Sequence, residues 1–263
     1  EEQMYNDYGI DKTEFLLKQA YFLDRDLWQV SKRTTKPKWV IVYAHLSPFT
    51  VTRAKRLQHW IPILEHYGVD LFLCGHNHTY SRSIPIKCGY NGSTKETDYN
   101  TYVPKSGTTY TVVNELTSNG KEITRTANTS QGTYYVMFQA AGAKMSGKEK
   151  AIDLSLLTLL DSNGNTLTSS SGTNYTKHFR EGTVRPWWYD YNSSLPTQPC
   201  FSTLDITSTT LSMSMNYVNN IKTTDKETKV FTIAEYDSTK NTIVNFDNLT
   251  INYSDRNPAY RTG

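Results

Sequence analysis

Residues 71–78 read LFLCGHNH, an apolar run that ends in a glycine and in two histidines one residue apart. The run is long enough for a buried strand, and alternate residues of an extended segment point to the same side. Because glycine adopts backbone angles that other residues avoid, a turn at Gly75 would let the imidazoles of His76 and His78 converge. This stretch therefore predicts a strand that delivers two side chains to one point.

A second stretch of the same design lies upstream. Residues 39–48 read WVIVYAHLSP, so that a β-branched run delivers His45 shortly before a proline. Parallel strands that both end in histidine would place these side chains at the carboxyl edge of an α/β sheet, where such folds hold their sites. Neutral imidazole nitrogens bind zinc, iron and manganese. We therefore expect His45, His76 and His78 to be metal ligands.

The segments around these strands predict helices. Residues 12–31 carry apolar residues at helical spacing with charged residues opposite, which is typical of an amphipathic helix. A second helix is expected from Thr52, its N-cap, to Gly68, its C-terminal stop. Pro62 predicts a break or a fresh first turn after Trp60. The second helix would connect the two histidine strands in one right-handed crossover.

Beyond Pro85 the chain is rich in Gly, Asn, Ser, Thr and Lys. A hairpin is expected from residues 108–116, across a turn at 118–120, to residues 123–127. Later strands are predicted at 201–206, 210–217, 229–234 and 242–246.

The two histidine stretches resemble the motifs of the calcineurin-like metallophosphoesterases, and within them the purple-acid-phosphatase-like branch. That branch writes the second motif as Gly-His-x-His-x-Tyr-x-Arg followed by Ser or Thr, and residues 75–83 read GHNHTYSRS. Residues 19–27, 132–136 and 140–144 are similar to segments that flank these motifs. The resemblance covers residues 15–90 and, less closely, residues 130–217, which is more than one short motif could support.

The resemblance implies an α/β (α+β) fold, namely the C-terminal part of a metallophosphoesterase β-sandwich flanked by helices, with extra β-rich C-terminal strands. We expect four parts: core with the histidine strands at 1–87, a hairpin-containing insertion at 88–131, remaining core strands and loops at 132–217, and a β-rich tail at 218–263. The insertion could form one wall of a substrate cleft or could be a solvated hairpin.

The resemblance also implies an activity, the metal-dependent hydrolysis of phosphate esters at a binuclear centre of Fe, Zn or Mn. His45 and His76 would bind one metal ion, and His78 the other. Two metal ions neutralise the phosphoryl oxygens, lower the pKa of a bound water and align the attacking and leaving oxygens.

Three further residues are candidates for the site. Many purple acid phosphatases carry additional histidines after the first motif, whereas residues 49–53 read FTVTR here, so Arg53 could supply positive charge instead. Arg82 could brace the loop or reach the phosphate as a fork-shaped donor. Tyr80 extends the alternation of the histidines and is expected to contact the substrate.

Several parts of the family's centre do not occur between Glu1 and Val40. These are Asp-x-His, Gly-Asp with a nearby Tyr, and Gly-Asn-His followed by Glu or Asp. The resemblance therefore implies the C-terminal portion of a longer phosphoesterase, whose N-terminal segment is an expected partner beside the phosphate-ester substrate. Alone, this chain is expected to be inactive, with partly exposed histidines and an uncovered apolar edge at residues 39–44.

Composition and charge argue against some classes of partner and indicate where the protein is located. A net charge of +3, dispersed along the chain, argues against nucleic acid or an anionic membrane surface as partner. No stretch approaches the ~20 apolar residues of a membrane span. A hydrophobic content of 37% and a mean hydropathy of −0.59 fit a polar extracytoplasmic protein, secreted or on the cell surface.

Two other functions stay open. The chain could be a binding or scaffold module that keeps the fold and has lost catalysis, and the missing N-terminal aspartates would discriminate this from an enzyme. It could also be a cell-surface protein whose C-terminal strands bind glycans. The aromatic cluster of residues 187–191 is the candidate for that role, and it could equally be core packing for a C-terminal sheet.

Overall fold

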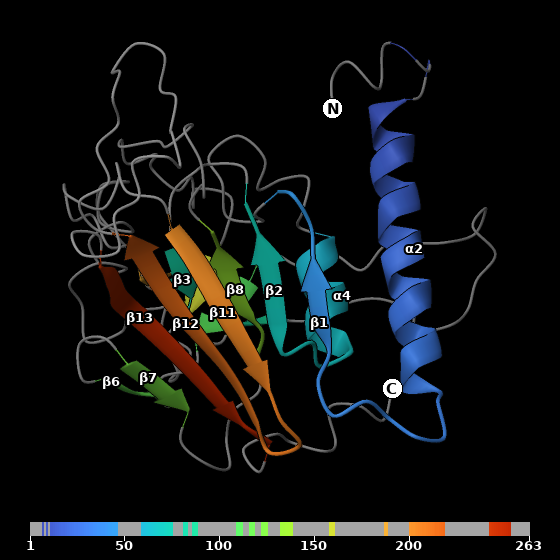
Figure 1. Ribbon diagram of the computed structural model, residues 1–263. Coiled ribbons are helices and arrows are strands. Elements are labelled where there is room, and N and C mark those ends of the chain that lie inside the picture. Colours follow the sequence, from blue (N-terminus) through green and yellow to red (C-terminus); the bar gives the residue numbers. More distant parts are fainter. Residues whose placement is uncertain are drawn as a thin grey trace.

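The structure of the protein is a computed structural model (Figure 1). It describes residues 7, 9, 11–46, 59–75, 81–83, 86–88, 109–112, 116–118, 122–125, 132–138, 158–160, 187–188, 200–218 and 242–253. Within these ranges, helices and three β-sheets combine in a mixed α+β fold, as the sequence predicts.

Helix α2 spans Lys12–Ser31, the range that its apolar periodicity predicts. Asp11 caps its start, because the carboxylate accepts hydrogen bonds from the amides of Thr13 and Glu14. The apolar face of the helix, on which Ala20 is fully buried, packs into the core. Within the described ranges, no helix is both long and apolar enough to cross a membrane.

The first sheet contains both predicted histidine strands. Its order is β1-β2-β8-β3-β10, with β1 at Ile41–Tyr43, β2 at Leu71–Cys74, β8 at Tyr134–Met137, β3 at Ser81–Ser83 and β10 at Trp187–Trp188. Strands β1, β2 and β8 are parallel, whereas β3 and β10 join antiparallel. The prediction of two parallel histidine strands is confirmed, and β2 has the predicted bounds.

Helix α4, at Trp60–His66, follows β1 and precedes β2 in the chain. It completes the predicted unit of strand, helix and parallel strand. The predicted start at Thr52 lies outside the described residues. Pro62 lies in the first turn of α4, where a proline removes no amide that the helix could use, as the sequence predicts.

The end of α4 is set by Gly68, as expected. Its backbone φ is 63°, in the left-handed region that favours glycine. The amide of Gly68 donates to the carbonyl of Glu65, and the amide of Val69 donates to the carbonyl of Leu64. This pair of bonds satisfies the last carbonyls of the helix and directs the chain into β2.

The second sheet has the order β11-β12-β13-β7-β6. Its strands are β11 at Cys200–Ile206, β12 at Thr210–Val218, β13 at Ile243–Asn252, β7 at Glu122–Arg125 and β6 at Leu116–Ser118. The first two strands match their predicted ranges closely, whereas β13 extends well beyond the predicted end at Phe246. The strand predicted at residues 229–234 lies outside the described residues.

The hairpin predicted in residues 108–127 is partly wrong. Strands β6 and β7 pair antiparallel across the expected turn, with Ser118 opposite Ile123. The earlier segment, β5 at Thr109–Val112, instead belongs to a third sheet, between β4 at Ile86–Cys88 and β9 at Thr158–Leu160. Local sequence identified the extended segments, but pairing partners distant in the chain leave no local signal.

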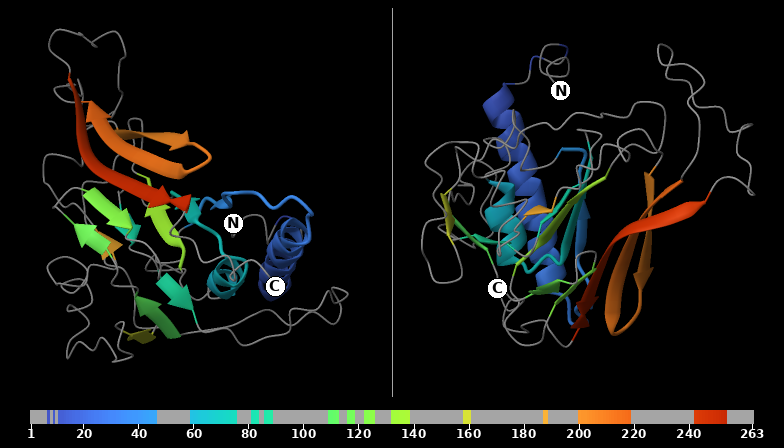
Figure 2. Two further views of the ribbon diagram at one scale, coloured as in Figure 1. Left: turned by 90° about the horizontal axis from the view of Figure 1, so that it is seen from below. Right: turned by 90° about the vertical axis from the view of Figure 1, so that its left-hand side faces the viewer.

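The main elements form three layers (Figure 2). Helices α2 and α4 cover one face of the first sheet, and the second sheet covers the other. Alternate residues of the buried strands serve the two interfaces, so that Phe72 and Tyr135 face the helices while Leu71 and Tyr134 face the second sheet. The assignment of this layered fold to the metallophosphoesterases, and the division into four parts, stay predictions.

A second contact between the sheets lies at the start of β1. The indole N–H of Trp39 donates to the carbonyl of Thr207 at 2.8 Å, and the ammonium of Lys38 donates to the carbonyl of Ser208 at 3.1 Å. The ring of Tyr253 lies edge-on to Trp39, with centroids 5.8 Å apart. These contacts fix the turn between β11 and β12 against the entry of β1.

A buried carboxylate ties α4 to the first sheet. Glu65 is 1% exposed, and its Oε1 accepts hydrogen bonds from the amide of Thr133 and from the hydroxyl of Tyr135, both at 3.1 Å. We expect Glu65→Ala to lower the free energy of unfolding by about 3 kcal/mol, because two buried donors lose their acceptor at ~1–3 kcal/mol each. Glu65→Gln keeps Oε1 and serves as the matched control in urea denaturation. Equal losses in the two variants would contradict this account.

Candidate metal centre

The predicted metal site is built on the neighbouring ends of β1 and β2. Tyr43 is paired with Leu73, and beyond it the amide of Ala44 donates to the carbonyl of Leu73 at 3.0 Å. The amide of Gly75 then donates to the carbonyl of His45, also at 3.0 Å. Backbone pairing thus continues up to His45, which lies at the same sheet edge as the residue directly before His76.

The other predicted ligands, His76 and His78, lie outside the described residues, as do Tyr80 and Arg53. Their roles stay predictions. His45 itself is exposed, in keeping with the expectation of exposed histidines in this chain. Across the described part of the chain, no three His, Cys, Asp or Glu side chains gather into a metal-binding group.

The expected role of Gly75 is wrong. We expected a turn there that only glycine could adopt, but the glycines with positive φ in the described ranges are Gly9, Gly68 and Gly132. A Cβ at Gly75 would lie 3.9 Å from the carbonyl oxygen of His45, an ordinary contact. The chain instead continues in sheet-like pairing at this point. Gly75 is thus a small residue at a strand end, with a backbone conformation that other residues can also adopt.

The backbone of Arg82 is fixed within the sheet. Strand β3 places Arg82 opposite Val136 of β8 on one side and opposite Trp188 of β10 on the other. The segment that follows the Gly-His-x-His motif therefore returns antiparallel into the same sheet. This pairing fixes the backbone that directly follows residues 76–80, and it leaves both predicted roles of the Arg82 side chain open.

Cys74 is a small residue of the core. It is 4% exposed, packs with the cluster between helices and sheet, and its thiol donates to the carbonyl of Val136 at 3.3 Å. Cys74 is the last residue of β2, directly before Gly75, so its packing helps to fix the strand end on which the predicted metal site is built.

A buried carboxylate, that of Asp70, connects the entries of β1 and β2, and no sequence motif predicted this role. The amide of Val40 donates to Oδ2 of Asp70 at 2.8 Å, and the amide of Asp70 donates to the carbonyl of Val40 at 2.9 Å. Asp70 is 3% exposed. This two-way contact fixes the entries of β1 and β2, just as the bond between Gly75 and His45 fixes their ends. An isolated aspartate before an apolar strand carries no sequence signal for such a role.

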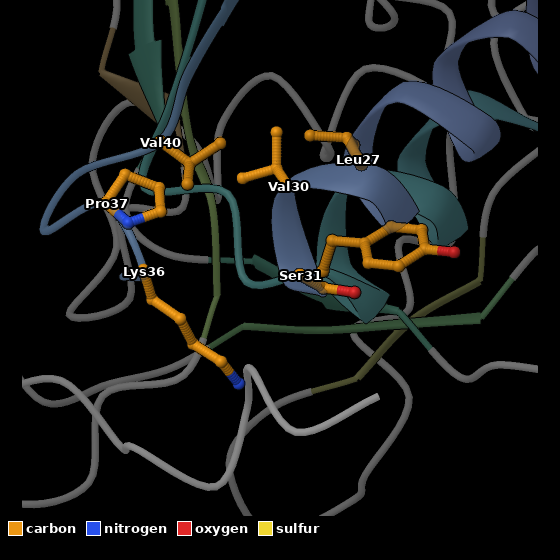
Figure 3. Close-up of a pocket in the computed structure, with 7 residues that line it drawn as sticks. Leu27, Val30, Ser31, Lys36, Pro37 and Val40 are labelled. Carbon is orange, nitrogen blue, oxygen red and sulfur yellow. The ribbon is translucent and has the colours of Figure 1, made fainter. Parts of the chain in front are cut away.

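A small solvent-open hollow lies at the other end of β1 (Figure 3). It is lined mainly by apolar side chains from the end of α2 and the entry of β1: Leu27, Val30, Ser31, Lys36, Pro37, Val40 and Tyr67. Val40 and His45 are separated by about 16 Å of extended chain, at ~3.3 Å per residue. The hollow is therefore distinct from the predicted metal site.

Comparison with known proteins finds a match over one stretch of the chain. No family model matches the chain. A stretch of 63 residues is 32% identical to the uncharacterized protein MT2654 of Mycobacterium tuberculosis strain CDC 1551, and likewise to the uncharacterized protein Rv2577 of strain H37Rv. The match covers 22% of this chain and 12% of each relative. This chain is thus similar in part to much longer mycobacterial proteins whose names assign no function.

Proposed function

We propose that this chain supplies the histidine ligands of a two-metal centre that hydrolyses phosphate esters. The observation that supports this most is the pairing of β1 and β2 up to their carboxyl ends, where the amide of Gly75 bonds to the carbonyl of His45. His45 and the Gly-His-x-His motif then start from one edge of one sheet. Open α/β sheets hold their ligands at such edges.

The donor set fits this chemistry in part. Three neutral imidazoles suit Fe, Zn or Mn, whereas a binuclear phosphoesterase also needs carboxylates, one of them bridging. In this proposal the carboxylates come from a preceding segment of the same precursor. The protein's location outside the cytoplasm belongs to the same proposal and rests on its polar composition.

The chain's own residues have distinct tasks in this mechanism. His45, His76 and His78 orient imidazole nitrogens, and the pairing of β1 and β2 fixes the backbone of His45 beside Gly75, the residue before His76. Tyr80 positions the substrate, while Arg53 and Arg82 add positive charge beside its phosphate or brace the loop. The metal ions, when bound, neutralise phosphoryl oxygens and lower the pKa of a water.

Metal analysis of the full-length protein, combined with hydrolysis of a generic aryl phosphate, tests the proposal. We expect about two metal ions per molecule, hydrolysis that a chelator abolishes, and recovery when metal is restored. Full metal occupancy without hydrolysis would favour the scaffold function. Hydrolysis that survives complete metal removal would exclude the proposed chemistry.

A further inference from the structure

One row of residues crosses the five described strands of the first sheet. Tyr43 of β1 pairs with Leu73 of β2, Leu73 with Val136 of β8, Val136 with Arg82 of β3, and Arg82 with Trp188 of β10. Residues that lie opposite one another in paired strands belong to the same face of the sheet. We call these five residues the Arg82 row. It joins the arginine of the Gly-His-x-His-x-Tyr-x-Arg motif to the aromatic strand β10.

The Arg82 row belongs to the face of the first sheet that packs against the second sheet (Figure 2). Leu73 and Val136 are part of the cluster between the two sheets, and Val136 is fully buried. The buried residues that the second sheet contributes to this cluster are all apolar: Leu211, Met213, Met215, Leu249 and Ile251. They offer no carboxylate to a cation in the row, and removing a cation from water without a partner is costly.

Within the row, Arg82 has one aliphatic and one aromatic neighbour. An aliphatic side chain such as that of valine offers a guanidinium no electrostatic attraction. The ring face of an aromatic residue attracts a guanidinium, and tryptophan does so best. Directly opposed residues of antiparallel strands have Cβ atoms ~4.5–5.5 Å apart, which is close enough for such a pair. The register therefore favours Trp188 as the partner of Arg82.

The row lies just behind the edge of the sheet that carries the predicted metal site. His45 follows Tyr43 by two residues and belongs to the same sheet face, because pairing with β2 continues up to Gly75. We propose that Trp188 is the positioning residue that directs the guanidinium of Arg82 toward this edge, where Arg82 binds the phosphate of the substrate. This inference rests on the proposed function, and it decides between the two predicted roles of Arg82 in favour of phosphate binding.

Kinetics of single and double variants of the metal-loaded, full-length protein test this pair. In Arg82→Ala and in Trp188→Ala, the KM for an aryl phosphate and the inhibition constant of inorganic phosphate should both rise roughly tenfold, as expected for the loss of a charge-assisted hydrogen bond, while kcat changes little. Because both substitutions remove the same contact, the double variant should lose no more than either single variant. Additive losses would overturn the proposal.

Two further variants distinguish positioning from a general role of β10 in the sheet. Trp187→Ala is the matched control, because Trp187 pairs with Ser83 and belongs to the opposite face of β10. It should leave both constants unchanged, and a loss equal to that of Trp188→Ala would contradict the proposal. Trp188→Phe keeps an aromatic face and should retain most of the phosphate binding. A loss as large as that of the alanine variant would also contradict it.

Urea unfolding of the same variants separates this inference from the proposed function. If the unsubstituted protein holds no metal and hydrolyses no phosphate ester, the proposed function fails, and the pairing of Arg82 with Trp188 is then measured by unfolding alone. A non-additive shift of the unfolding midpoint in the double variant supports the pairing, and additive shifts overturn it. Metal binding and hydrolysis, together with additive losses in KM and in midpoint, would leave the proposed function standing and defeat this inference.

Discussion

Replacing His76 or His78 by alanine in the full-length protein should remove bound metal and phosphatase activity together. Each substitution deletes an imidazole that the proposed centre uses as a direct ligand. Loss of an outer partner of a metal ligand already costs ~10–100-fold in affinity or activity, so loss of the ligand itself should cost more than that. Metal content by elemental analysis and turnover of an aryl phosphate measure the two effects.

The matched control is His59→Ala. His59 precedes helix α4, is partly buried, and makes no side-chain capping bond. The substitution removes the same chemical group from a residue that is not an expected ligand, so metal content and turnover should stay near those of the unsubstituted protein. Normal metal content and turnover in His76→Ala and His78→Ala would refute the assignment of these ligands.

The second large effect is the loss of activity that we expect when the chain is produced without a preceding segment. We expect these 263 residues, expressed without any preceding segment, to show no phosphatase activity and at most weak metal binding. In the proposed centre, the three histidines give one metal ion two nitrogen donors and the other a single donor, and the expected ligand set of this chain contains no carboxylate to bridge them. The comparison is between this chain and the full-length protein at equal concentration, with Zn, Fe or Mn added.

Circular dichroism of the chain serves as the control, since a folded but inactive chain is the expected state. A fully coordinated binuclear centre in the isolated chain, or hydrolysis by it, would show that the carboxylates come from within these residues. The preceding segment would then be unnecessary for catalysis.

Local features of the fold could be predicted from the sequence. Helix α2 and strand β2 have their predicted ranges because periodicity, the Asp11 cap and the apolar run of β2 act over a few neighbouring residues. The end of α4 at Gly68 follows from a backbone conformation that other residues disfavour. Each of these signals is contained in the segment that it describes.

Features that depend on distant partners could not be predicted. Strand β5 pairs with β4 and β9, and its composition does not distinguish this from the hairpin that we expected. The roles of Glu65 and Asp70 likewise depend on what surrounds them, since a buried carboxylate and an exposed one look alike in sequence. Gly75 shows the converse error, in which a motif suggested a backbone constraint that the fold does not impose.

For the candidate site, the sequence predicted that His45 and the Gly-His-x-His motif meet at one sheet edge. The strand pairing agrees as far as Gly75. The positions of His76 and His78 remain predictions, because their placement depends on residues beyond the paired strand ends.

The clamping of β1 and β2 at both ends has a consequence for the entropy of metal capture. Asp70 holds the entries of the two strands and the Gly75–His45 bond holds their exits, so the backbone under the first ligand is ordered before any ion arrives. In the proposed centre, metal binding would therefore restrict few additional backbone torsions at His45. The ordering cost would fall on the segment that brings the carboxylates, so that metal affinity and the docking of that segment would be thermodynamically coupled, each strengthening the other.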